Sequence, residues 1–194
     1  MTSSSPASSR SPGPARLREL RAADRAPLAA LLRATGSFPE NEIAVALELI
    51  DEGIMEGSGA ARDAYRFRVA ELAADPARVV GYVCWGLAPM TDGVFDLYWI
   101  AVDPALQGGG VGRALMAAAE ADVVARGGRM VLVETGGKPS YLPTRRFYER
   151  IGYREIARLP DYYRSGDDKV IYARRVDGAA LPESAAARKD GGGA

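Results

Sequence analysis

The chain has 194 residues, 47% of them hydrophobic, which is enough for one well-filled core and too few for two independent domains. Its 25 basic and 25 acidic side chains cancel, so we expect no nucleic-acid partner and no membrane association. Histidine is absent and Cys84 is the single cysteine. This excludes an intrachain disulfide, a Ser-His-Asp triad, a His-ligated metal and a metal-thiolate cluster, and we expect no metal.

The two ends of the chain have the composition of disordered tails. Residues 1–14 are rich in Ser, Pro, Ala and Gly, and residues 179–194 end in RKDGGGA, which leaves residues 15–178 as the predicted domain. A transit peptide is the alternative interpretation of residues 1–14. The amino terminus has no signal-peptide core, and no stretch approaches the ~18 apolar residues of a membrane helix. With a single cysteine, this predicts a cytoplasmic protein.

A short strand and two helices are predicted in the first quarter of the chain. Residues 16–20 can form the strand, and Asp24 can cap the helix that follows. That helix carries Leu28, Leu31 and Leu32. In the second helix, within residues 40–54, apolar side chains recur at helical spacing at Ile43, Ala46, Leu47 and Ile50.

Strand patterns dominate the middle of the chain. In residues 65–69, Tyr, Phe and Val alternate with two arginines, which predicts a half-exposed strand. Residues 79–87 and 94–102 are nearly continuous apolar runs, typical of central strands, and the turn-rich segment 89–93 joins them.

The remaining segments alternate between helix and strand. A helix is predicted after Gly112, ending near residues 127–128, and residues 129–135 form the next strand. Pro143 can open a further helix that Gly152 stops, and two strands follow at residues 153–158 and 169–176. The order is mixed α/β.

A glycine-rich loop lies between strand 94–102 and the helix after it. Backbone N–H groups of such a loop and of the first helical turn have no intrahelical partners, and the helix dipole adds partial positive charge, so a pyrophosphate can accept several hydrogen bonds there. Gln107 can brace the loop or reach a ligand, and Arg113 adds a fixed charge. The candidate anion-binding residues are Gln107, Gly108, Gly109, Gly110, Val111, Gly112 and Arg113.

The loop alone also fits a flexible turn before a helix. A dinucleotide fingerprint, GxGxxG, requires a third glycine where the chain has Arg113 or Leu115. A Walker A loop requires GK followed by Ser or Thr, which the loop lacks. A nucleotide-binding module remains an alternative function, although the loop matches neither of these two nucleotide-binding motifs.

A second motif lies downstream of the loop, at Phe147, Tyr148, Gly152 and Tyr153. Together the two motifs resemble those of the GCN5-related N-acetyltransferase (GNAT) superfamily. The loop matches the signature Q/R-x-x-G-x-G/A through Gln107, Gly110 and Gly112. The resemblance covers about residues 15–176, and two positions depart from it. Tyr141 stands where many members carry an asparagine that contacts the pantetheine arm, and Thr144 stands where many carry an alanine. The second motif, FYxxxGF/Y, is matched by Phe147, Tyr148, Gly152 and Tyr153.

The resemblance implies a fold and a reaction. The fold is a single α/β (α+β) domain with a central mixed, mostly antiparallel twisted sheet of six to seven strands flanked by about four helices. Acetyl-CoA is the implied co-substrate, held by the loop and by exposed backbone groups of Ile100, Ala101 and Val102. The acetyl group passes directly, in a ternary complex, to a small-molecule or peptide amine. A homodimer stays open.

Catalytic roles follow from the resemblance and from the residue inventory. Tyr148 sits at the family position that protonates the CoA thiolate, and its alternative role is packing beside Phe147. Glu134, slightly ahead, and Asp96 are the candidate bases, since each interrupts an apolar run; a carboxylate at a wet sheet edge is the alternative. A backbone N–H near the strand end, at Val102, can stabilise the oxyanion. Cys84 belongs to the core and is not the nucleophile.

The acceptor is the open question. In the superfamily its pocket is built by the early helices and the loop between the last two strands. Carboxylates there can attract a cationic amine or simply face water. A non-catalytic acyl-CoA sensor is the alternative function, which an intact Tyr148 disfavours. The carboxylates are Glu40, Glu42, Glu48, Asp51, Asp161, Asp167 and Asp168.

Overall fold

The computed structural model describes residues 15–57 and 65–181. The predicted tail 1–14 and residues 182–194 of the second predicted tail lie outside the described residues, so the predicted domain limits stay a prediction. The strands are β1 (Ala15–Arg18), β2 (Arg66–Leu72), β3 (Asp75–Leu87), β4 (Val94–Val102), β5 (Met130–Gly136), β6 (Arg154–Arg164) and β7 (Asp167–Arg175). The helices are α1 (Arg25–Thr35), α2 (Glu40–Glu56), α3 (Val111–Ala125) and α4 (Leu142–Arg150), with short 3-10 turns at residues 22–24, 104–106 and 139–141.

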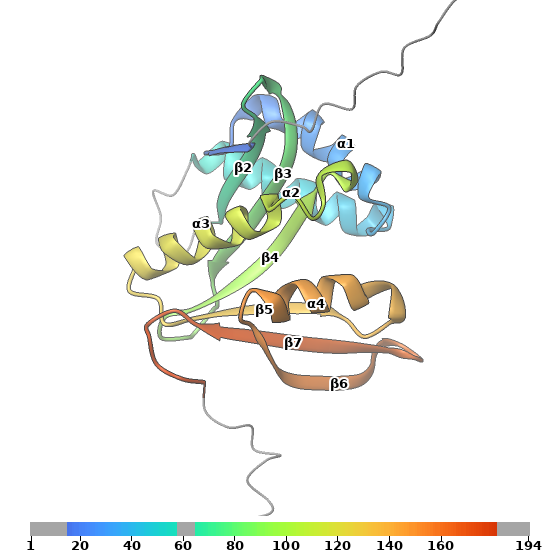
Figure 1. The fold of residues 1–194 in the computed structure, drawn as a ribbon, viewed down its shortest axis with the longest axis vertical. Coiled ribbons are helices and arrows are strands. Elements are labelled where there is room, and N and C mark those ends of the chain that lie inside the picture. Colours follow the sequence, from blue (N-terminus) through green and yellow to red (C-terminus); the bar gives the residue numbers. More distant parts are fainter. Residues whose placement is uncertain (1–14, 58–64, 182–194) are drawn as a thin grey trace, which may run out of the picture.

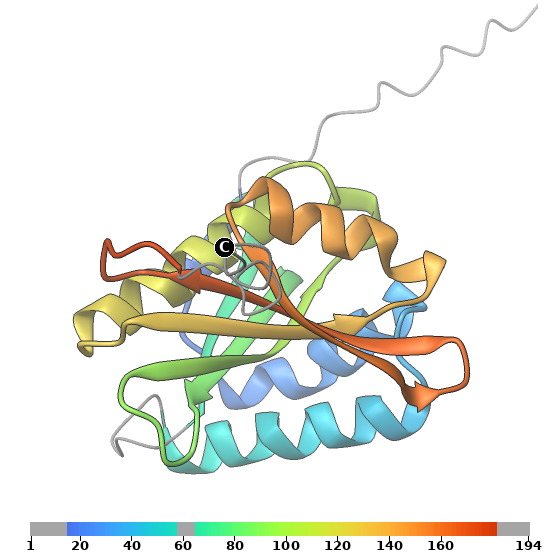
Figure 2. The same ribbon diagram turned by 90° about the horizontal axis from the view of Figure 1, so that it is seen from below.

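The strands form one seven-stranded sheet in the order β1-β2-β3-β4-β5-β7-β6. All neighbours are antiparallel except β4 and β5, which are parallel. Helices α1 and α2 cover one face of the sheet, and α3 and α4 cover the other (Figures 1 and 2). The mixed, mostly antiparallel sheet and the four helices confirm the predicted fold class. No helix in the described parts of the chain is long and apolar enough to cross a membrane.

Each face of the sheet has its own hydrophobic core. The α1–α2 core joins the apolar stripes of these helices to side chains of β2, β3 and β4, and it contains Leu28, Leu32, Ile43 and Ile50, each at most 2% exposed. The α3–α4 core joins α3 and Tyr148 of α4 to side chains of β2–β5 and β7. Each fully buried large aliphatic side chain contributes about 1.5–3 kcal/mol, so the two cores hold the helices to the sheet.

Strand β2 was predicted to be half-exposed, and that prediction is wrong. Phe67 and Val69 pack into the α1–α2 core, as the alternation suggested. Arg66 on the other face is only 6% exposed, because the carboxyl-terminal part of α3 covers it, and its Nε lies 3.7 Å from Asp122 Oδ2. The aliphatic part of an arginine can pack against apolar surface while its guanidinium contacts a carboxylate. Arginines that alternate with apolar residues therefore do not show that one face of the strand is exposed to solvent.

Asp24 occupies the N-cap position of α1 without capping it. Its side chain accepts no hydrogen bond from the first turn of the helix; instead both carboxylate oxygens pair with Arg18, at 2.6 and 2.7 Å. Arg18 also pairs with Glu71 of β2, and all three side chains are nearly buried. This network joins β1, the start of α1 and β2. A buried carboxylate needs such a partner, which explains why the capping prediction failed.

We expect Gly53→Ala to destabilise the fold. A Cβ on Gly53 of α2 would lie 2.3 Å from Cε2 of Phe67, so the ring must move. Overpacking of this kind costs about 1–3 kcal/mol and outweighs the gain of about 1 kcal/mol in helix propensity. Urea unfolding measures the loss, and a double-mutant cycle with Phe67→Leu should recover part of it. A variant as stable as the wild type would show that the α2–β2 contact is looser than described.

Candidate active site

Strands β4 and β5 are paired over only the first half of β4. Four parallel residue pairs join them, the last being Leu97 with Val133. Beyond that pair the strands diverge, and Figure 1 shows them opening like a V. We call the space between residues 98–102 of β4 and residues 134–136 of β5 the β4–β5 gap. Because the gap leaves one edge of β4 without a neighbouring strand, the backbone there is available to a ligand.

A β-bulge on β4 marks the point of divergence. Leu97 pairs with Trp85 of β3 and Trp99 pairs with Cys84, so Tyr98 has no partner on β3. A bulge bends a strand and increases its twist, which turns the end of β4 away from β5. It also reverses the faces: odd-numbered residues of β4 point into the α3–α4 core before the bulge, and even-numbered residues do so after it.

The backbone groups beyond the bulge alternate between β3 and the gap. The N–H of Asp103 donates to Val80 O at 2.9 Å, so it points toward β3. Peptide groups alternate along a strand, hence those of Ala101 also point toward β3, and those of Ile100 and Val102 point into the gap. Of the three residues predicted to offer backbone groups, two are oriented to do so.

Helix α3 begins at the edge of the gap with unpaired donors. Gly108 and Gly110 have φ of 80° and 88°, a left-handed conformation that other residues rarely adopt. The first intrahelical hydrogen bond of this turn runs from Ala114 N–H to Gly110 O, at 3.0 Å. Within the described residues, the N–H groups of positions 110–113 therefore have no acceptor, as expected for a helix start. The exposed loop is a ready anion site.

Side chains next to the loop hold it in shape. Asp103 Oδ1 accepts from Ala105 N–H at 2.9 Å, and Asp103 Oδ2 pairs with Arg78 at 3.0 Å. Gln107 Nε2 lies 3.5 Å from Val102 O, so the amide links the loop to the end of β4. Arg113 is exposed beside the first turn of α3. These contacts brace the loop against the end of β4 and against Arg78 of β3.

The two sequence motifs meet in the fold. A Cβ on Gly112 would lie 3.3 Å from Phe147, so the first turn of α3 and the ring of α4 are in close contact. Phe147 in turn lies 5.4 Å from the ring of Tyr148, measured between centroids. The anion loop and the predicted acid are therefore joined through a single aromatic side chain.

Tyr148 lies on the α3–α4 face of the sheet and is 3% exposed. Its ring also contacts those of Tyr153 and Tyr172, at 5.9 and 6.0 Å between centroids. Burial raises the pKa of the Tyr148 phenol well above its ordinary value, so the hydroxyl stays protonated at neutral pH. Tyr148 therefore packs against neighbouring rings, as the alternative role predicted, and also carries a protonated hydroxyl that can act as a donor.

The two candidate bases lie on the opposite face. Leu97 and Val133 point into the α3–α4 core, so their neighbours Asp96 and Glu134 point away from it. Burial raises the pKa of Asp96, the nearby charge of Glu134 raises it further, and Lys169 lowers it. Glu134 is half-exposed, and its Oε2 lies 2.5 Å from Lys169 Nζ.

Cys84 is in the core, as predicted. The thiol is 1% exposed in the α1–α2 core, and burial raises its pKa well above the ordinary value. A thiolate nucleophile at this position is therefore excluded on both access and ionisation.

Tyr141 fills the position where the resemblance predicted asparagine. A Cβ on Gly136 would lie 2.8 Å from its ring, so the ring packs directly on the end of β5. Arg145 of α4 donates to Gly136 O at 2.7 Å and to Lys138 O at 3.0 Å, which fixes the chain that follows. These contacts hold the β5 side of the gap.

Most of the carboxylates predicted near the acceptor have partners within the fold. Glu40 pairs with Arg33 and Asp51 with Arg25 on the helices. On the last two strands, Asp168 pairs with Arg158. The Asp167 carboxylate meets Lys138 and Arg164, at 3.1 and 3.6 Å. Because most of these carboxylates are already paired with arginine or lysine, together they attract a cationic amine less strongly than seven free carboxylates would.

Comparisons with known proteins agree with this geometry. A family model described as an acetyltransferase (GNAT) domain matches residues 63–155. A crystal structure from Desulfovibrio desulfuricans, described as a GNAT-family acetyltransferase, is 43% identical and covers 84% of this chain and 99% of its own, with a TM-score of 0.77. A protein of Methanocaldococcus jannaschii named as an uncharacterised N-acetyltransferase is 34% identical over 118 residues, 60% of this chain and 70% of the relative. The chain belongs to the GNAT acetyltransferase family.

This GNAT protein is an N-acetyltransferase, as the motifs predicted. A structure from Salmonella typhimurium, described as an acetyltransferase with its cofactor acetyl-CoA, is 17% identical and covers 88% of this chain and 99% of its own, with a TM-score of 0.64. At that identity the likeness shows the fold, and the fold of this chain is thus one that holds acetyl-CoA in a relative.

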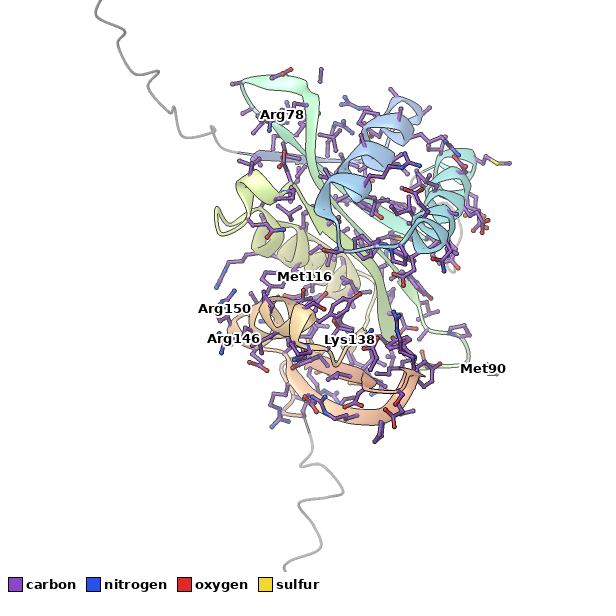
Figure 3. All side chains as sticks on the ribbon, turned by 90° about the vertical axis from the view of Figure 1, so that its right-hand side faces the viewer. Arg78, Met90, Met116, Lys138, Arg146 and Arg150 are labelled. Atoms are coloured by element: carbon purple, nitrogen blue, oxygen red, sulfur yellow. The ribbon has the colours of Figure 1, made fainter. Side chains whose placement is uncertain are left out.

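Three cationic residues of this acetyltransferase were missed from the sequence. Arg146 and Arg150 project from α4 into solvent, on the left of Figure 3, and α4 packs beside the anion loop. They are one helical turn apart, so the sequence places them on one face of the helix. It does not show that this helix lies beside the anion loop. Lys169, which contacts Glu134, comes from β7, 35 positions farther along the chain. Only the strand order brings the two together.

Proposed function

We propose that this acetyltransferase binds acetyl-CoA in the β4–β5 gap and transfers its acetyl group directly to an amine that approaches from the other face of the sheet. The observation that carries this proposal is the placement of the candidate acid and bases. Tyr148 lies on the α3–α4 face, and Asp96 and Glu134 lie on the opposite face, at the point where the strands part. A thioester in the gap would have a proton donor on one side and a proton acceptor on the other.

The binding groups follow from the backbone. The free N–H groups of residues 110–113 and the charge of Arg113 suit the pyrophosphate. Arg146 and Arg150 on α4 add positive charge for the remaining phosphate. The C=O of Ile100 and the peptide groups of Val102 are oriented to hydrogen-bond the pantetheine amides, as a neighbouring strand would. Gln107 braces the loop, and Gly108 and Gly109 let the anion approach it.

The chemistry needs few groups. The N–H of Ile100, directed into the gap near the bulge, donates to the carbonyl oxygen as negative charge develops there. The donor expected from the sequence, the N–H of Val102, lies six residues from Asp96 along β4, roughly 20 Å at ~3.3 Å per residue, and is too far from the base to act on the same carbonyl. Asp96 accepts the proton of the amine, directly or through one water, and Tyr148 donates a proton to the departing thiolate. With Cys84 buried and protonated, an acyl-enzyme on that residue is excluded, which favours transfer in a ternary complex.

Asp96 is the better base of the two carboxylates, a reversal of the order expected from the sequence. We expect Asp96→Asn to lower kcat/KM by about 10- to 100-fold and Glu134→Gln to lower it only a few-fold. The physical reason is that Glu134 is already paired with Lys169, whereas the raised pKa of Asp96 makes it a stronger base. Steady-state rates with both variants measure this. A larger loss in Glu134→Gln would assign the base to Glu134 instead.

An acceptor screen with thiol detection tests the function itself. Purified protein is incubated with acetyl-CoA and a panel of small amines, amino acids and peptides with free amino groups, and release of CoA is recorded with and without each. Acceptor-dependent release supports the proposal. Tight acetyl-CoA binding with no release for any amine would favour the acyl-CoA sensor. Thermal stabilisation by ATP or NAD but not by CoA would favour a nucleotide-binding module.

A further inference from the structure

Lys169 lies on the face of the sheet from which the amine is proposed to approach, opposite the α3–α4 face. It lies on β7 opposite Gly136 of β5, and its side chain is 15% exposed. Its Nζ lies 2.5 Å from Glu134 Oε2 and 4.7 Å from the centroid of the Tyr162 ring. One ammonium group thus has a carboxylate and an aromatic ring as fixed partners, which is a strong restraint on a long side chain.

The groups that face Asp96 come from three strands. From β5, Glu134 adds negative charge, and from β7, Lys169 adds positive charge. From β4 itself, Tyr98 lies close enough for the Asp96 charge to help raise its pKa to about 12, mainly an effect of burial. Tyr98 therefore stays neutral near pH 7, and the charge balance at Asp96 depends on the Glu134–Lys169 pair.

We propose that Lys169 is a positioning residue, which holds Glu134 away from the reacting amine and keeps Asp96 ionised as the proton acceptor. The proposal rests on the proposed function and on the assignment of Asp96 as the base. Without Lys169, the like charges of Asp96 and Glu134, on the same face of the neighbouring strands β4 and β5, would lose the cation that β7 places beside Glu134. One of the two carboxylates would then tend to bind a proton, and a protonated carboxyl cannot accept another.

The direction of the pH effect follows from these charges. A base works in its deprotonated form, so the rate falls as the pH drops through its pKa. Removing the positive charge of Lys169 raises the pKa of Asp96, and the acid limb of the pH–rate profile moves to higher pH. Removing the negative charge of Glu134 lowers the pKa of Asp96, and the acid limb moves to lower pH.

The test compares pH profiles of kcat/KM for the full-length wild type, Lys169→Met and Lys169→Arg, using the best acceptor from the screen. We expect the acid limb of Lys169→Met to move up by about one pH unit. Lys169→Arg keeps the charge and should stay within a few tenths of a unit of the wild type. Thermal unfolding of each variant, recorded over the same pH range, separates changes in folding from changes in ionisation.

Glu134→Gln supplies the second measurement, with an expected shift to lower pH. Opposite shifts in the two variants support the proposal. An unshifted limb in Lys169→Met, with only a lower rate or a lower Tm, would reduce Lys169 to a structural residue and overturn the inference while leaving the acetyltransferase function intact. If instead Asp96→Asn keeps full activity, the base assignment fails and the inference fails with it.

Discussion

Replacing Gly110 with valine is expected to lower the affinity of the acetyltransferase for CoA by at least about 100-fold. Gly110 has φ of 88° at the N-cap of α3, a conformation that a β-branched residue adopts only under strain. No atom would lie within 4 Å of the new Cβ, so the damage comes from the backbone and not from a clash. Relief of the strain turns the loop N–H groups away from the phosphates, and each charge-assisted hydrogen bond contributes about 1.5–3 kcal/mol.

Gly178→Val is the matched control. Gly178 has φ of 81° and open space around it, and it lies after β7, beyond the carboxyl-terminal end of the sheet strand that pairs with β5. Isothermal titration of CoA into both variants measures the effect. We expect Gly178→Val to lose some stability and to bind CoA as the wild type does. Equal affinities of the two variants would mean that the loop backbone contributes little to CoA binding.

The second large effect is expected for Tyr148→Phe, which should lower kcat by about 100- to 1000-fold and change the Kd for CoA by less than about threefold. The ring that packs between Phe147, Tyr153 and Tyr172 is kept, and only the hydroxyl is lost. That hydroxyl is protonated near neutral pH, and burial, which raises its pKa, keeps it so, which leaves it able to supply a hydrogen bond or a proton to the departing thiolate. Stopped-time assays for kcat and titration for Kd separate the two quantities.

Tyr153→Phe is the matched control for that experiment. Its hydroxyl donates to Glu120 at 3.0 Å, and its ring lies 5.9 Å from that of Tyr148. Loss of this bond to a carboxylate costs about 1.5–3 kcal/mol of stability and should leave kcat within a few-fold of the wild type. A parallel fall in kcat and CoA affinity for Tyr148→Phe would instead assign Tyr148 to binding or packing.

Continuous apolar runs located the centre of the fold well. Strand β4 has the bounds that were predicted for it, because a strand buried on both faces is apolar throughout and ends where turn residues begin. Strand β6 was predicted at residues 153–158 and continues to Arg164, although nearly all of it is exposed. An edge strand needs no apolar pattern, since one partner strand and solvent suffice. Pattern-based reasoning therefore fails most at the edges.

The candidate site was predictable where it is local in sequence. The glycine loop and the FY motif are each contained in one segment, and their contact through Gly112 and Phe147 is a consequence of the fold. The relation between Asp96, Glu134 and Lys169 was not predictable, because it depends on the strand order β4-β5-β7 and on the register within it. The bulge at Tyr98 could not be predicted from the sequence either, because it depends on the register between two strands. Its only signature is a pairing offset between β3 and β4.

The four residue pairs that join β4 to β5 have a further consequence. They are the only strand-to-strand bonds between the two halves of the described sheet, so the halves are held together by few hydrogen bonds and by the cores around them. If the pantetheine arm hydrogen-bonds to Ile100 and Val102 as proposed, the donor substrate acts as an inserted strand and closes the sheet. Resistance of the enzyme to unfolding then rises with the concentration of acetyl-CoA, because the ligand binds the folded state alone.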